Sequence, residues 1–198
     1  MGTNRPLEGT NPLTPANHYT YKDYLHWPPE ERWEVIHGVA YSMSPSSNRK
    51  HQGVLRELSR QIGTFLLRMP CKLFMAPFDV LLGAPTESIE ETSTIVQPDL
   101  LVVCDLSKLT DIGVVGGPDF IIEIQSPSTA FRDQVEKKLL YEKHGVKEYW
   151  VVNPETLEVF IYRLKNGRYG FPEPADLRKA TPVSLFQGLE LQVKEEDI

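Results

Sequence analysis

The sequence has little cysteine, no long apolar run and no excess of basic residues. Its 198 residues include two cysteines, Cys71 and Cys104, both inside apolar strand-like runs and without the spacing of a metal site. We therefore expect buried free thiols in a reducing compartment rather than a disulfide framework or a zinc site. No apolar run approaches the ~20 residues that a membrane span needs, and the N-terminus lacks the apolar segment of a secretory signal. The expectation is a cytoplasmic protein with no membrane partner.

The charge balance is acidic rather than basic. Asp and Glu number 27 against 21 Lys and Arg, which gives a net charge of −6. Domains that coat DNA usually carry a basic surface, so this balance counts against extensive nucleic-acid binding. However, an active site crowded with carboxylates lowers the isoelectric point by itself, and a bound divalent cation reverses the local sign. Net charge therefore does not exclude a nucleic-acid substrate.

What is present is the pattern of one mixed α/β (α+β) domain. The first 18 residues are polar and rich in Pro and Gly, which predicts a flexible leader over 1–18 and a single domain over 19–198. Helices are predicted at about 20–27, 48–69 and 131–144, the second capped within Ser46-Ser47-Asn48 and the third ended by Gly145. Strands are predicted over 33–36, 39–43, 73–82, 95–104, 120–125, 148–152 and 158–162. The two strands flanking the last helix suggest a crossover unit in a central mixed sheet.

Three carboxylates stand in runs where a charge is costly. Asp99 lies in IVQPDLLVV, Glu123 in FIIEIQ and Asp79 in FDVLL. A carboxylate in such surroundings is desolvated unless it is paired or bound to a cation. Each acid alone is more simply a strand-end residue facing water or an acid paired with Arg or Lys. Together they favour a site for Mg²⁺, which prefers one or two carboxylates plus waters and phosphate oxygens.

Several linked motifs resemble the Uma-type putative restriction endonuclease family, within the PD-(D/E)xK nuclease superfamily. The resemblance covers roughly residues 19 to 190 and rests on motifs in a fixed order: WEVIHG at 33–38, the later His51, Pro98-Asp99, EIQSPST at 123–129, Asp133…Lys137…Tyr141, Gly145-Val146 and EYW at 148–150. It implies a restriction-endonuclease-like fold with helices flanking the sheet. It also implies a divalent-metal site and cleavage of DNA.

The sequence departs from the superfamily pattern at one position. Where the pattern has Glu-x-Lys, this chain has Glu123-Ile124-Gln125, and glutamine can donate a hydrogen bond but carries no positive charge. The resemblance places a substitute lysine on the next helix, at Lys137, with Lys138 as the second choice. An Asp133–Lys137 pair on a solvated helix face is the ordinary alternative.

The remaining candidate residues surround these acids. The resemblance matches Glu34 to an early family glutamate that ligates a metal or orients water, although alone it would be read as a surface acid. His51, near the start of the long helix, is either at the cleft or a capping or surface histidine. We expect Arg49, Arg56 and Arg60 to share an exposed helix flank, where they would contact substrate phosphates or simply solubilise the protein. Ser126, Ser128 and Thr129 are expected to form a turn and a helix cap.

The combined hypothesis is a Mg²⁺-dependent endonuclease, with Mn²⁺ as a possible substitute, that hydrolyses phosphodiester bonds in nucleic acid, with DNA expected. Asp99, Glu123 and the Ile124 carbonyl would hold the metal with help from Asp79, while Lys137, Glu34 and Gln125 would act on water or substrate. The alternative is a catalytically weak or inactive nuclease-fold module that binds nucleic acid or protein, and Gln125 is its best support. A third alternative applies the same metal site to a small phosphate ester. A homodimer is expected because cutting both strands usually needs two sites.

Overall fold

The computed structural model describes residues 18–43, 48–84, 86–126 and 132–198, except the side chains of 132–134. The predicted leader therefore lies almost wholly outside the described residues. So do the predicted cap residues Ser46 and Ser47, the turn residues Ser128 and Thr129, the helix start at Phe131 and the side chain of Asp133.

The main sheet has mixed strand directions and seven strands, in the order β12-β11-β10-β9-β6-β3, with β13 paired to β11. Its strands are β3 (Lys72–Met75), β6 (Leu100–Val103), β9 (Phe120–Ile124), β10 (Glu148–Val152), β11 (Glu158–Lys165), β12 (Arg168–Tyr169) and β13 (Glu173–Asp176). Strands β6, β9 and β10 are buried along their whole length, as their continuous apolar runs predict. β9 and β10 are parallel and are joined through a helix, so the predicted crossover is confirmed.

A second sheet of six strands has the order β2-β1-β5-β4-β8-β7. It contains β1 (Trp33–Ile36), β2 (Val39–Ser42), β4 (Val80–Leu81), β5 (Ile95–Val96), β7 (Leu109–Thr110) and β8 (Gly113–Val115). The predicted β1–β2 hairpin is confirmed, with positive φ at both turn residues, His37 (52°) and Gly38 (80°). A small additional hairpin pairs β14 (Thr181–Pro182) with β15 (Glu190–Leu191).

Two of the predicted strands are wrong, because each is split between the two sheets. The run 73–82 becomes β3 in the main sheet and β4 in the second sheet, and the run 95–104 becomes β5 and β6. In each case a proline, Pro77 or Pro98, lies at the break. Proline has no N–H to donate to a strand ladder, so the chain leaves one sheet there and joins the other. This split puts Asp79 and Asp99 just outside strands rather than within them.

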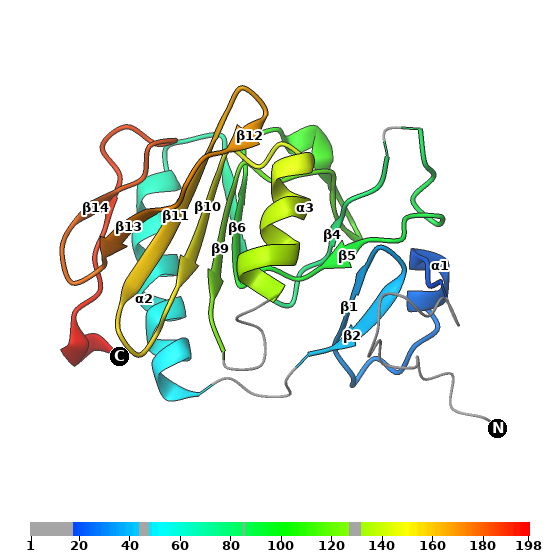
Figure 1. The fold of residues 1–198 in the computed structure, drawn as a ribbon, viewed down its shortest axis with the longest axis horizontal. Helices are drawn as coiled ribbons and strands as arrows, with labels where there is room; N and C mark the ends of the chain where they lie inside the picture. The colour runs from blue at the N-terminus through cyan, green and yellow to red at the C-terminus, as the bar shows by residue number, and fades with distance from the viewer. Residues whose placement is uncertain (1–17, 44–47, 85, 127–131) are drawn as a thin grey trace.

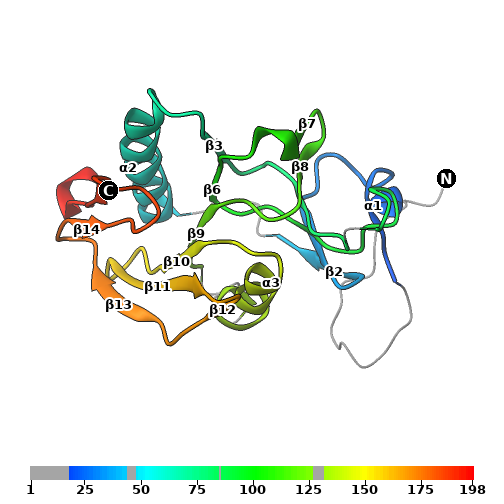
Figure 2. The ribbon, with the colours of Figure 1, turned by 90° about the horizontal axis from the view of Figure 1, so that it is seen from above.

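The helices cover opposite faces of the main sheet. Helix α2 (Arg49–Leu66) packs its apolar stripe on one face, while η2 (Arg132–Lys137) and α3 (Lys138–Lys143) lie on the other (Figures 1 and 2). Asn48 caps α2 by accepting a hydrogen bond from the His51 amide at 2.8 Å. Gly145, with φ of 75°, ends the α3 segment as predicted. The short elements α1 (Tyr21–Tyr24), η1 (Leu106–Lys108) and η3 (Glu195–Asp197) complete the described fold, and none of its helices is long and apolar enough to cross a membrane.

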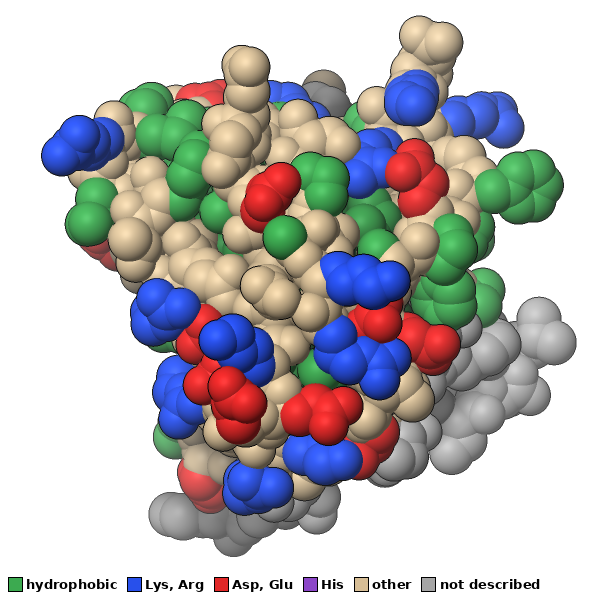
Figure 3. All heavy atoms as spheres, turned by 90° about the vertical axis from the view of Figure 1, so that its left-hand side faces the viewer, with side chains coloured by type: hydrophobic (Ala, Val, Ile, Leu, Met, Phe, Trp, Pro, Cys, Tyr) green, Lys and Arg blue, Asp and Glu red, His purple; other side chains and the backbone are tan. Residues whose placement is uncertain are grey.

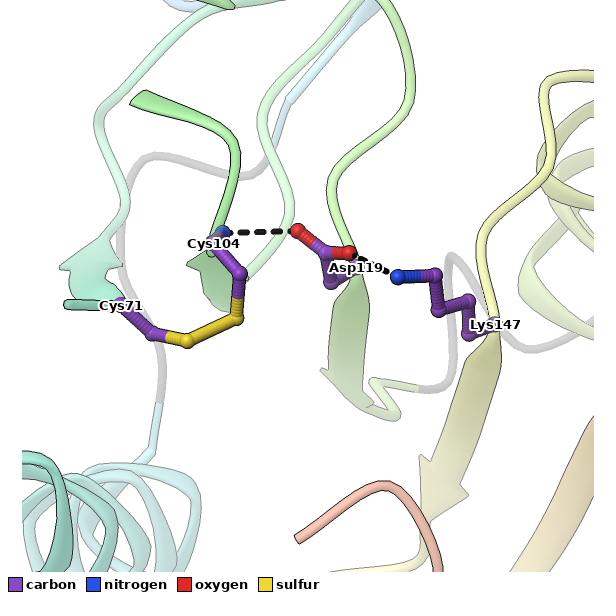
Figure 4. Close-up of a disulfide and its surroundings, with 4 residues drawn as sticks. All are labelled: Cys71, Cys104, Asp119 and Lys147. Carbon is purple, nitrogen blue, oxygen red and sulfur yellow. Dashed lines mark hydrogen bonds and ion pairs between the residues drawn. A yellow bond between two sulfur atoms is a disulfide. The ribbon is translucent and has the colours of Figure 1, made fainter. Parts of the chain in front are cut away.

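The cysteines correct another expectation, because Cys71 and Cys104 form a disulfide rather than two free thiols. Lys72 pairs with Val103 across β3 and β6, so the residues just beyond them, Cys71 and Cys104, face one another (Figure 4). The Cys104 amide also donates to Asp119 at 2.7 Å. The sequence separation of 33 residues hides this cross-strand contact from inspection of the sequence. The predicted cytoplasmic location therefore loses the support that free thiols would have given it.

Candidate active site

Asp99 and Glu123 lie side by side at one end of the β6–β9 pair. Leu100 pairs with Ile122 in the antiparallel register, so the next position outward sets Asp99 opposite Glu123. The Asp99 amide donates to Glu123 Oε2 at 3.4 Å, and the Ile124 amide donates to Asp99 Oδ2 at 2.8 Å. Two acids far apart in the chain thus converge at the carboxyl end of β9, and neither forms an ion pair with arginine in the described part of the chain.

Lys137 brings a buried ammonium group to this end of the sheet. Its Nζ lies 2.9 Å from Glu123 Oε1 and 2.8 Å from Glu34 Oε1, and its side chain is 3% exposed. One turn further along, the Tyr141 hydroxyl donates to the same Glu123 oxygen at 2.9 Å. The spacing of four residues puts Lys137 and Tyr141 on one helical face, which is the face turned to the sheet.

Glu34 connects the second sheet to this cluster. It lies in β1, is 1% exposed, and accepts a hydrogen bond from the Gln97 amide at 2.9 Å on the same oxygen that contacts Lys137. The surface-acid interpretation of Glu34 is therefore wrong. The site is assembled where the two sheets meet the η2–α3 segment.

His51 reaches Asp99 from the opposite face of the main sheet. Its Nε2 lies 3.3 Å from Asp99 Oδ2. The residue is 8% exposed, and its Nδ1 is buried without a hydrogen-bond partner among the described residues. His51 belongs to the buried stripe of α2, so neither the surface nor the capping interpretation describes its side chain.

The cluster carries more negative than positive charge. Among the described residues, Glu34 and Glu123 share the Lys137 ammonium, while Asp99 contacts His51 and has the most exposed side chain of the three acids at 21%. Repulsion between close carboxylates is relieved by a cation, and Mg²⁺ commonly takes one or two carboxylates plus water. Within the described ranges, no group of three or more Asp, Glu, His or Cys side chains is placed to hold a metal ion. A cation here would therefore have at most two carboxylate ligands and would keep several waters.

Gln125 stands where the superfamily pattern has lysine. Its amide donates to the Val152 carbonyl at 2.8 Å, which extends the β9–β10 ladder. Its side-chain Nε2 is buried and has no hydrogen-bond partner within the described residues. The positive charge beside the Glu123 carboxylate comes instead from the ammonium of Lys137, fourteen residues further along the chain.

Comparisons with known proteins identify the family and the fold of the chain. Residues 21–194 match the family Uma2, described as "Putative restriction endonuclease". The chain belongs to the Uma2 family. It is also 24% identical to the uncharacterised protein slr1290 of Synechocystis over 155 residues, which is 77% of each chain. A crystal structure of a putative nuclease belonging to DUF820 from Anabaena variabilis matches with a TM-score of 0.69 and 21% identity, covering 90% of this chain and 96% of that one. The restriction-endonuclease-like fold expected from the sequence is thereby confirmed.

In this Uma2 chain, Asp79 belongs to a neighbouring network rather than to the acid pair. Its Oδ1 accepts from Gln97 Nε2 at 2.8 Å and from the Tyr24 hydroxyl at 3.3 Å. The Gln97 side-chain oxygen in turn accepts from Arg32 at 2.8 and 3.0 Å. Burial raises the pKa of Asp79 above its ordinary value, while these hydrogen bonds and Arg32 act in the opposite direction. The contacts of Asp79 give no support to a role as a metal ligand.

Lys138 and the three arginines of α2 also point away from the acids. The Lys138 ammonium lies 5.6 Å from the ring centre of Tyr162. Arg49 donates to the Ile198 carbonyl at 2.8 Å, Arg56 donates to the Asp197 carbonyl, and Arg60 pairs with Glu57. At 3.6 residues per turn, these arginines lie roughly 140–180° around the helix from His51. Figure 3 shows positive and negative side chains intermixed on the side of the molecule that carries α2 and the C-terminus.

Sequence reasoning missed Gln97 as part of the site. This residue is 7% exposed and links three groups: its amide donates to Glu34, and its side chain bridges Asp79 and Arg32. Its position two residues before Asp99, in the break between β5 and β6, was the available signal. A polar residue in such an apolar run needs a partner, and here it has several.

Proposed function

We propose that this protein is a Mg²⁺-dependent nuclease that hydrolyses phosphodiester bonds in DNA. One observation carries the proposal: Asp99 and Glu123 meet across the β6–β9 register, with the buried Lys137 ammonium 2.9 Å from Glu123. Family membership supports a nuclease, while the metal and the DNA substrate are inferred from the donor set and from the chemistry of phosphate transfer.

The acid pair would provide the metal ligands. We infer that the carboxylates of Asp99 and Glu123 and the Ile124 carbonyl would hold Mg²⁺ or Mn²⁺, with no direct part for Asp79. When bound, such a cation polarises a phosphate oxygen and lowers the pKa of a coordinated water. The 21% exposure of the Asp99 side chain supports access from solvent to this end of the sheet.

Lys137 and Glu34 would act on the charge that hydrolysis develops. Lys137 supplies the ammonium group that Gln125 lacks, and fixed positive charge in a water-poor site stabilises negative charge in the transition state. Glu34 positions that ammonium through its 2.8 Å contact, and Gln97 and Tyr141 hold the two glutamates from either side. Preorganised contacts of this kind avoid reorganisation during the reaction.

The experiment is a cleavage assay on plasmid, linear DNA and RNA with Mg²⁺ or Mn²⁺, using wild type, Asp99→Asn and Glu123→Gln. Each substitution keeps the side-chain shape but removes a ligand charge, so we expect cutting to fall by about 10²-fold or more. Asp111→Asn, at an exposed turn between β7 and β8, is the matched control and should cut like wild type. Cleavage that survives both site substitutions would overturn the proposal.

A second candidate is a nuclease-fold module that binds nucleic acid or protein without cutting it. The side-chain amide of Gln125 favours this candidate, because it occupies the usual lysine position without a positive charge. Its Nε2 is buried and has no hydrogen-bond partner among the described residues. Binding of DNA that persists in Asp99→Asn and Glu123→Gln, with no cutting under either metal, would establish it. Phosphate release from small esters alone would point to the third alternative.

Assembly and location remain proposals as well. A double-strand cut usually needs two sites, so we propose a homodimer, to be tested by light scattering with and without DNA. A cytoplasmic location is also proposed, because a DNA substrate would be found there.

A further inference from the structure

A cavity of about 760 Å³ lies at the other end of the β9–α3 unit from the acid pair. Four of its lining side chains can carry positive charge: His37, Lys108, Lys143 and His144. They come from the β1–β2 turn, the η1 segment and the end of α3. Segments distant in sequence thus bring basic groups to one hollow of an acidic protein.

The cavity is distinct from the candidate active site. Lys137 lies beside Glu123 at the N-terminal end of α3. Lys143 and His144 lie at its C-terminal end, roughly 10 Å further along the helix axis. Gly117, which also lines the cavity, precedes β9, while Glu123 lies near the end of β9. None of the acids of the candidate site lines the cavity.

The basic groups of the cavity are only weakly neutralised. The Lys108 ammonium donates to the Gly117 carbonyl at 2.7 Å. Neither Lys108 nor Lys143 forms an ion pair within the described ranges. Glu87 is the only acid in the described lining, and its carboxylate accepts from the Ala84 amide at 2.9 Å. Burial lowers the pKa of His144, and the nearby Lys143 and His37 lower it further. His144 therefore favours its neutral form, and Lys108 and Lys143 carry the positive charge of the cavity. Among the described residues, Glu87 is the acid in its lining, and Asp105 and Asp119 interact with Lys108 from outside it.

Two glycines shape the wall of the cavity. A Cβ on Gly117 would lie 2.2 Å from the His144 carbonyl oxygen, so glycine at this position lets the two segments of the wall pack closely. Gly116 adopts φ of 95°, which disfavours other residues, and no atom lies within 4 Å of where its Cβ would be. A cavity of this size is within the range that encloses small organic ligands.

We propose that this cavity binds a phosphate-bearing ligand of nucleotide size, independently of the acid pair. Lys143 and His144 would contact the phosphates, and Lys108, held at the Gly117 carbonyl, would add positive charge. The ligand is either a free nucleotide or a phosphate of a bound nucleic-acid strand, since both present the same charged group. The proposal does not depend on whether the acid pair cuts DNA.

The test is a titration of the full chain with ADP by calorimetry and with a short DNA duplex by fluorescence anisotropy, both in EDTA so that no divalent metal contributes. The variants are Lys143→Gln and the double substitution Lys143→Gln with His144→Gln. Lys179→Gln removes an equally exposed positive charge outside the cavity and is the matched control. Circular dichroism would verify that each variant is folded.

We expect the double variant to bind one of the two probes about tenfold or more weakly, a change of about 1.4 kcal/mol, while Lys179→Gln binds like wild type. A loss confined to ADP identifies a free nucleotide as the ligand, and a loss confined to the duplex identifies the nucleic-acid backbone. Equal binding by wild type and double variant, or no binding of either probe, would overturn the proposal. Asp99→Asn should bind that same probe as wild type does, and a loss there would place the probe at the acid pair instead.

Discussion

Lys137 and Lys143, at the two ends of α3 in the β9–α3–β10 unit, differ in burial and in their partners. At one end Glu123 and Lys137 are 4% and 2% exposed, and each charged group has a partner that fixes its position. At the other end Lys143 is exposed and forms no ion pair in the described part of the chain. The chain's net charge of −6 gives no sign of this difference.

Burial, rather than charge alone, determines what each of these lysines can do. A buried ammonium between two carboxylates is fixed in place and is costly to remove. An exposed lysine beside an open cavity keeps its mobility and contributes little to folding, so it remains available to a ligand. The substitutions below contrast these two situations.

Replacing the buried lysine should have the largest effect. We expect Lys137→Met to lower the free energy of unfolding by about 3–5 kcal/mol, because it leaves Glu34 and Glu123 buried without their shared cation. Lys143→Met, six residues further along the same segment, should stay within about 0.5 kcal/mol of wild type. Urea unfolding in EDTA measures both values.

A second substitution sharpens this contrast. Adding Glu34→Gln to Lys137→Met removes one of the two unpaired charges, so part of the lost stability should return. If Lys137→Met and Lys143→Met unfold at the same urea concentration, the Lys137 ammonium does not lie between the two glutamates in solution.

Breaking the disulfide should have the next largest effect. Asp99 and Cys104 flank the two ends of strand β6, so the crosslink to Cys71 secures the end remote from the acid pair. Closing a loop of this length contributes about 2–4 kcal/mol. We expect a reductant, or the double substitution Cys71→Ser with Cys104→Ser, to lower the unfolding midpoint while leaving DNA cleavage at moderate temperature intact. An unchanged midpoint under reductant would restore the original expectation of free thiols.

The sequence predicts the elements that local pattern controls. The stripe of α2, its Asn48 cap, the His37-Gly38 turn and the β9–α3–β10 crossover follow from periodicity and turn chemistry. The sequence also predicts that Asp99 and Glu123 lie together, provided that the two apolar runs that carry them form neighbouring strands. These features depend on residues close together in the chain or on a single strand pairing.

The predictions from the sequence fail where contacts between residues far apart in the chain determine the structure. Pro77 and Pro98 transfer the chain between sheets, and nothing in the apolar runs around them shows that two sheets exist. Arg49 and Arg56 contact the last residues of the sequence, more than a hundred positions away, so their spacing on α2 misleads. The cationic cavity likewise combines turns and helix ends that no local motif connects.

Asp79 provides the smallest and most selective test, because it is an acid outside the acid pair. Burial raises its pKa in the folded protein, so the folded state takes up a proton at a higher pH than the unfolded chain does. The contribution of Asp79 to stability therefore falls as the pH rises through this window, and Asp79→Asn removes that contribution.

The Asp79→Asn variant should thus be the more stable protein at pH 7–8, and its advantage should vanish as the pH falls to the ordinary aspartate range near 4. The gain should stay within about 1 kcal/mol, because the amide loses charge assistance in the hydrogen bonds from Gln97 and Tyr24. Thermal unfolding from pH 4 to 8 measures the difference, with Asp111→Asn as the exposed control. DNA cleavage by Asp79→Asn should match wild type, and a loss as large as that of Asp99→Asn would make Asp79 a third member of the acidic end.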